Sequence, residues 1–139
     1  MEYHVLIADD EPEIRSILAD WFSEMFPKES QDNCVIYEAK NGTEAAAKAD
    51  ECRKSGKSLD LAIIDVVMPN RSGLEAIANL QRASPSTHIV IFSATASASL
   101  RAEQLQARYG SKVTVLDKPI RKAEFFDAIK NVLGGNYRA

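Results

Sequence analysis

The stretch LDLAIIDVV, residues 59–67, is an almost unbroken apolar run that contains the carboxylate Asp65. Apolar residues without alternation are typical of a strand buried on both faces, as in a parallel sheet that helices cover on either side. Asp65 is costly inside such a run unless a cation or hydrogen-bond donors compensate its charge. This segment therefore predicts both a class of fold and a functional site.

Four further short apolar runs predict strands, and each of the five strands is followed by a helical segment. The strands are expected at 3–8, 34–39, 59–67, 88–93 and 112–116, and the helices at 12–25, from the turn 41–43 to about 53, 74–84, 96–108 and 121–133. The apolar stripe of the first helix is expected to consist of Ile14, Ile17, Leu18, Trp21, Phe22 and Met25. This alternation predicts an α/β fold, a (βα)5 doubly wound parallel sheet with helices on both faces.

Length and composition are those of one globular domain: 139 residues, of which 45% are apolar and 27% charged. No segment approaches the length of about 18 apolar residues that a membrane span needs. The acidic N-terminus lacks the basic flank of a signal peptide. We therefore expect a cytoplasmic protein without membrane contact, with a domain at 1–134 and a C-terminal tail or linker stub at 135–139. Cys34 and Cys52 are expected to be reduced packing residues.

The charge of the chain is divided unevenly between its two halves. Residues 1–70 hold 7 basic and 15 acidic side chains, whereas residues 71–139 hold 10 basic and 5 acidic ones. This division is compatible with a region that attracts cations and a surface that attracts anions, or with uneven solvated charges that have no function.

Polar groups follow four of the five predicted strands. Because parallel strands end at one edge of a sheet, these groups are expected to surround one ligand. They are Asp9, Asp10 and Glu11 after the first strand, Asp65 in the third, Ser93 after the fourth, and Asp117, Lys118 and Pro119 after the fifth. Each group alone has an ordinary structural explanation: a helix cap, a satisfied hydroxyl or a surface lysine. Glu38 and Ala39, at the end of the second strand, have no evident partner.

Clustered carboxylates repel one another, so this edge requires cations. Lys118 supplies one, and carboxylates without a nearby His or Cys form an oxygen site suited to Mg²⁺. A carboxylate nucleophile beside Mg²⁺, a lysine and a hydroxyl also has the components that phosphoryl transfer needs.

With these motifs in place, the chain resembles the receiver domain of two-component response regulators. The resemblance spans residues 3 to about 134 and rests on LIADDEPEIR, DLAIIDVVMPNRSG, IVIFSAT and VLDKPI, in that order along the chain. It implies the flavodoxin-like strand order 2-1-3-4-5.

The resemblance implies a metal site and a phosphoacceptor. Asp10, Asp65 and the main-chain carbonyl of Val67 would ligate Mg²⁺, with Asp9 acting through a water. Asp65 would accept a phosphoryl group from a sensor histidine kinase or a phosphotransfer protein. The protein would then be no turnover enzyme, but a phosphoacceptor with its own autophosphorylation and autodephosphorylation chemistry.

The resemblance also assigns groups around the phosphoryl. Lys118 would pair with the acceptor and then with a phosphate oxygen, and a cis peptide bond before Pro119 would aim it into the site. Ser93 would bind the phosphoryl group and move on activation. The family usually has an aromatic residue where this chain has Val115, so the coupling of Ser93 to the output elements is left open.

The output elements implied are the segments 96–108, 112–116 and 121–133. Phosphorylation would change their affinity for an unknown output protein or domain, and a homodimer through them is one option. Their basic residues could attract an acidic partner: Arg101, Arg108, Lys112, Arg121, Lys122 and Lys130. Direct nucleic-acid binding by this domain is not expected.

Two other classes of function remain as alternatives. The first is a pseudo-receiver, an interaction module that works without phosphorylation. The second is a phosphohydrolase with an aspartyl nucleophile, although such enzymes generally carry D-x-D after the first strand and this chain has Asp9-Asp10-Glu11. Nucleotide-binding glycine motifs are absent from the sequence.

Overall fold

Five strands form one parallel sheet in the order β2-β1-β3-β4-β5 in the computed structural model, which describes residues 1–65, 73–93, 104, 107–108 and 112–133. The strands are β1 (Glu2–Ala8), β2 (Asn33–Ala39), β3 (Leu61–Asp65), β4 (His88–Ser93) and β5 (Val113–Asp117). The helices are α1 (Pro12–Met25), α2 (Gly42–Lys54), α3 (Gly73–Ala83) and α5 (Lys122–Leu133). The doubly wound fold and the strand order expected from the sequence are confirmed.

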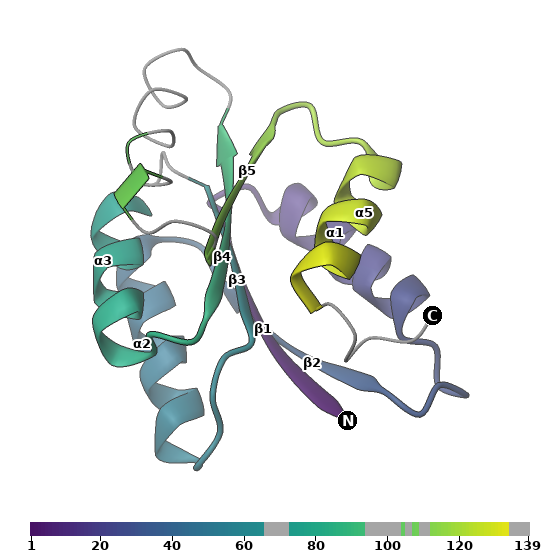
Figure 1. Ribbon diagram of the computed structural model, residues 1–139, viewed down its shortest axis with the longest axis horizontal. Helices are drawn as coiled ribbons and strands as arrows, with labels where there is room; N and C mark the ends of the chain where they lie inside the picture. Colours follow the sequence, from purple (N-terminus) through teal and green to yellow (C-terminus); the bar gives the residue numbers. More distant parts are fainter. Residues whose placement is uncertain (66–72, 94–103, 105–106, 109–111, 134–139) are drawn as a thin grey trace.

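The helices cover both faces of the sheet, with α2 and α3 on one side and α1 and α5 on the other (Figure 1). Alternate residues of β1 supply the two cores. Tyr3, Val5 and Ile7 pack in the cluster of α1 and α5, whereas Leu6 and Ala8 pack in the cluster of α2 and α3. Burial on both faces explains why the strand sequence is apolar without alternation.

Local signals set the ends of the helices. Pro12 occupies the first turn of α1, where a missing N–H is harmless. Asn41 caps α2, because its side-chain oxygen accepts a 2.8 Å hydrogen bond from the Glu44 N–H. After α2, Gly56 adopts a φ of +80°, a conformation that glycine reaches without strain.

The prediction for one residue of the apolar stripe of α1 is wrong. Leu18, Phe22 and Met25 are buried, but Ile17 is 44% exposed. Successive residues of a helix are about 100° apart, so Ile17 lies at the rim when Leu18 points into the core. At that rim it lines a hollow of about 220 Å³ with Pro119 and Ile120.

Some sequence expectations concern residues that the structure does not describe. Val67, Arg101 and the tail 135–139 lie outside the described residues. Of the helix expected at 96–108, residues 104, 107 and 108 are described and are helical. Cys34 and Cys52 are free thiols, half-buried and buried, as expected. Among the described helices, none is long and apolar enough to cross a bilayer.

The direction of strand order changes at β1, which lies between β2 and β3. Ala8, the last residue of β1, is in register with Ala39 on one side and Ile64 on the other. The residues that follow these strands therefore emerge side by side, at the place where ligands bind to open α/β sheets.

Candidate metal centre

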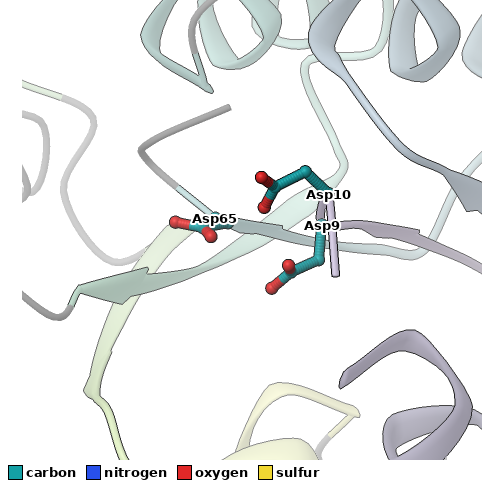
Figure 2. Close-up of side chains that lie close together, drawn as sticks. All are labelled: Asp9, Asp10 and Asp65. Carbon is teal, nitrogen blue, oxygen red and sulfur yellow. The ribbon is translucent and has the colours of Figure 1, made fainter. Parts of the chain in front are cut away.

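Three carboxylates meet at the carboxyl end of the sheet. Asp9 and Asp10 directly follow β1 and Asp65 is the last residue of β3, and one oxygen of each lies within 4.8 Å of the others. Figure 2 shows Asp9 and Asp10 at adjacent positions of the chain with Asp65 across from them. Asp9 and Asp65 are buried, with 1% and 9% exposed, whereas Asp10 is exposed to solvent.

Lys118 reaches this cluster from the end of β5, 53 residues after Asp65. Its Nζ lies 3.0 Å from Oδ2 of Asp65 and 3.5 Å from Oδ2 of Asp9. The peptide bond between Lys118 and Pro119 is cis. The structure thus brings together four of the residues that the sequence singled out: Asp9, Asp10, Asp65 and Lys118.

Burial and charge oppose each other in this cluster. Burial raises the pKa of Asp9, and the hydrogen bond from the Glu11 N–H and the charge of Lys118 offset this rise only in part. Burial by itself lowers the pKa of Lys118, but the hydrogen bond and the charge of Asp65, together with Asp9, outweigh it and raise the pKa. Asp9 is therefore costly to ionise, while Lys118 is held firmly in its charged form.

Among the residues that the structure describes, the cluster has more negative than positive charge. Three carboxylates face one ammonium, and Asp10 has no ion pair among the described residues. The donors are all carboxylate oxygens, two of them on buried side chains, and neither His nor Cys belongs to the group. A small divalent cation with a preference for oxygen, such as Mg²⁺, fits this donor set and would relieve the repulsion.

A layer of contacts beneath the carboxylates was not predicted from the sequence. Nη1 of Arg15, in α1, donates a 2.6 Å hydrogen bond to the main-chain carbonyl of Asp9, and its Nε donates to Glu38 at 3.2 Å. The Asp9 N–H donates to the carbonyl of Ala39 at 3.0 Å. The only hint in the sequence was the unexplained Glu38-Ala39 at a strand end, since bonds to main-chain atoms produce no hydrophobic period.

The other predicted positions are placed only in part. Ser93 ends β4 at the same edge of the sheet, in register with Asp117; its side chain and Val67 lie outside the described residues. Val115 is paired with Ile91 and packs, half-buried, against the core beside α2 and α3.

Comparisons with known proteins agree on one family and one fold. The sequence model of one protein family, the response regulator receiver domain, matches residues 5–130 of this chain. The chain is 29% identical to the chemotaxis protein CheY of Halobacterium salinarum, over 96% of this chain and 98% of that protein. It is also 29% identical to the glycerol metabolism activator of Pseudomonas putida, over 96% of this chain and 55% of the activator.

Among solved structures, the chemotaxis response regulator CheY4 of Vibrio cholerae superposes with a TM-score of 0.72 at 24% identity. The superposition covers 96% of this chain and 100% of that one. This likeness shows the fold alone. The chain thus spans nearly the whole of the chemotaxis relative and about half of the activator.

Proposed function

Because this chain belongs to the receiver domain family of two-component response regulators, we propose that it is a phosphorylation-dependent signalling switch in which Asp65 is the phosphoacceptor. The observation that carries the proposal is the contact of 3.0 Å between Lys118 Nζ and Asp65 Oδ2, inside a cluster in which the described carboxylates outnumber the described cations. Asp65 is the carboxylate that touches the lysine most closely and lies at the point where the strand order reverses.

In the proposed reaction, a carboxylate oxygen of Asp65 attacks the phosphorus of a phosphohistidine on a sensor kinase or phosphotransfer protein. An O–P bond forms, the N–P bond breaks, and the departing imidazole keeps the bonding electron pair. Lys118 holds the acceptor carboxylate before transfer and neutralises a phosphoryl oxygen afterwards. Ser93, at the end of β4, is proposed to hydrogen-bond the phosphoryl group.

Asp10, Asp65 and the main-chain carbonyl of Val67 are proposed to bind Mg²⁺, with Asp9 acting through a water. The bound cation would neutralise charge on the transferring oxygens. What supports this assignment is the group of three carboxylate donors, beside which the described residues place one ammonium and so leave a local deficit of positive charge.

An apolar hollow beside Lys118 supports the docking of a phosphodonor protein. It measures about 220 Å³ and is bordered by Ile17 and Trp21 of α1 and by Pro119 and Ile120. A partner seated there would lie next to the lysine and the acceptor. We propose this hollow as part of the surface for the kinase or phosphotransfer protein.

The output surface is proposed to comprise the segment 96–108, β5 and α5, acting on an output protein or domain or on a second copy of the chain. Arg121 and Lys130 are exposed on this side. Lys122 is exposed as well and pairs with Glu24 of α1 at 2.6 Å, a surface ion pair between α5 and α1. The proposed domain extends over residues 1–134, with 135–139 as a tail or linker stub.

The test is phosphoryl incorporation from acetyl phosphate with Mg²⁺, followed by intact mass. The wild type is expected to gain one phosphoryl group and Asp65→Asn none, with the circular dichroism of the variant unchanged. Asp60→Asn is the matched control, because Asp60 lies just before β3 and its carboxylate accepts only a structural bond of 2.8 Å from the His4 N–H. Incorporation by Asp65→Asn would refute the acceptor assignment. No incorporation by the wild type would favour a pseudo-receiver.

A further inference from the structure

The peptide group that joins Asp9 to Asp10 is held by contacts that the proposed phosphoryl chemistry does not use. The Asp9 carbonyl belongs to this peptide group and accepts the 2.6 Å bond from Arg15 Nη1. The Asp9 N–H is fixed to Ala39 of β2, and the Asp9 carboxylate accepts a 2.9 Å bond from the Glu11 N–H. Asp9 is therefore tied through its amide, its carbonyl and its side chain.

Asp10 depends on this arrangement more than its neighbour does. It is exposed and has no ion pair within the described ranges, so its own side chain has little to hold it. The direction in which it leaves the chain is set by the plane of the preceding peptide group. Whatever fixes that plane also limits the directions in which the Asp10 carboxylate can face Asp65.

Arg15 is itself held in place. Its Nε donates to Glu38 Oε1 at 3.2 Å, and its side chain is 17% exposed while that of Glu38 is 49% exposed. The guanidinium thus links α1, the end of β2 and the peptide group after Asp9. Because Glu38 balances its charge, Arg15 acts here through geometry more than as a further cation of the cluster.

We propose that Arg15, supported by Glu38, is a positioning residue for the divalent cation: it orients the peptide group between Asp9 and Asp10 so that both carboxylates converge with Asp65. This inference rests on the proposed Mg²⁺ site. Groups that orient metal ligands in this way are typically worth about 10- to 100-fold in metal affinity.

The test measures Mg²⁺ binding to the full chain by calorimetry, with Trp21 fluorescence as a second signal because Trp21 and Lys118 border one hollow. Arg15→Ala is expected to raise the Kd for Mg²⁺ about tenfold or more. Glu38→Ala should cause a smaller loss in the same direction, and Arg15→Lys a loss between those of the wild type and Arg15→Ala. The matched control is Arg53→Ala on α2, which removes an exposed arginine paired with Asp50 at 3.0 Å and should leave the Kd unchanged.

A second readout separates positioning from a general loss of structure. The Mg²⁺ concentration for half-maximal phosphorylation by acetyl phosphate should rise in Arg15→Ala, while the rate at saturating Mg²⁺ returns to that of the wild type. Asp65 and Lys118 are untouched in this variant. A lower saturating rate with an unchanged Mg²⁺ dependence would overturn the proposal.

The outcomes distinguish this inference from the function on which it rests. If the wild type binds Mg²⁺ and Arg15→Ala binds it equally well, the positioning role fails and the proposed function stands. If the wild type itself binds no Mg²⁺, both fail. Should Arg15→Ala not fold, Arg15→Lys and Glu38→Ala decide, and unchanged affinity in both would overturn the proposal.

Discussion

Polar groups at the two ends of the sheet differ in whether each one has a partner of its own. At the amino end, His4 lies between Glu2 and Tyr37, with ring nitrogens 2.8 Å from the carboxylate of Glu2 and 3.0 Å from the hydroxyl of Tyr37. There, Asp60 accepts from the His4 N–H at 2.8 Å, and the buried Thr87 hydroxyl donates to the Leu59 carbonyl at 2.8 Å. At the carboxyl end, the ammonium of Lys118 contacts Asp65 and Asp9, and Asp10 has no ion pair among the described residues.

The difference separates structural polar groups from functional ones. A buried polar group that has its own partner stabilises the fold and needs nothing else. A group of carboxylates with too few cations remains strained until a ligand arrives, because like charges repel strongly where water is excluded. An imbalance of charge at a strand end is thus a better indication of a site than the presence of polar residues.

The largest expected effect is on Mg²⁺ binding at the carboxyl end. Asp9→Asn and Asp10→Asn should each raise the Kd for Mg²⁺ about tenfold or more and reduce the thermal stabilisation that Mg²⁺ gives the wild type. Calorimetry and melting curves with and without Mg²⁺ measure both effects.

The two variants should differ in the absence of metal. The pKa of Asp9 is higher in the folded state than in the unfolded state, so folding favours the protonated carboxyl. The contribution of Asp9 to the free energy of unfolding is therefore favourable only at acid pH. It is lost as the pH rises through the pKa that Asp9 has in the folded protein. Ionised Asp9 therefore destabilises the metal-free protein at neutral pH, and Asp9→Asn should stabilise it. Asp10→Asn removes a charge that water screens at an exposed position, so it should stabilise the metal-free protein less than Asp9→Asn does; equal changes in the two variants would contradict the distinction between them.

A medium effect is expected for Lys118, the only cation that the described residues bring within ion-pair distance of the cluster. Lys118→Met should lower the free energy of unfolding by about 1.5–3 kcal/mol at pH 8, because Asp65 and Asp9 lose a charged partner. The pKa of Lys118 is raised in the folded protein. Its contribution to the free energy of unfolding is therefore complete below about pH 10.4, the pKa of a lysine in an unfolded chain. The contribution is lost as the pH rises through the pKa that Lys118 has in the folded protein. Urea denaturation of both proteins from pH 8 to alkaline pH measures the difference, which should shrink at the alkaline end. If the difference in free energy of unfolding stays constant across this pH range, the charge of Lys118 is not what stabilises the folded protein.

The smallest effect is expected at the amino end of the sheet. Thr87→Val should lower the free energy of unfolding by about 1 kcal/mol, because the bond to the Leu59 carbonyl is lost in a buried place. The Mg²⁺ affinity and the phosphorylation of Asp65 should not change. A weaker affinity for Mg²⁺ in this variant would contradict the distinction between structural and functional polar groups, since it would show that the two ends of the sheet are coupled.

Much of the fold could be predicted because strands buried on both faces appear in the sequence as continuous apolar runs. The run 59–67 predicted a covered parallel sheet, and the carboxylate of Asp65 within it predicted a site at the strand end. Ile17 was placed wrongly, since helical spacing does not show how far around a helix the core extends. Arg15 and Glu38 were missed as partners because their contacts depend on how α1 sits against the end of β2.

The order of residues along the chain suffices for the alternation of strands and helices and for the positions of acids at the ends of the first and third strands. These are local properties, set by hydrophobic period and by the cost of a carboxylate in an apolar run. Which charges lie close together depends instead on how the strands are arranged in the folded chain. The register of Ala8 with Ile64 sets Asp9 and Asp10 beside Asp65, and the return of β5 brings Lys118 to them. Coulomb energy depends on distance in space and on the exclusion of water, and neither is recorded in the order of residues along the chain.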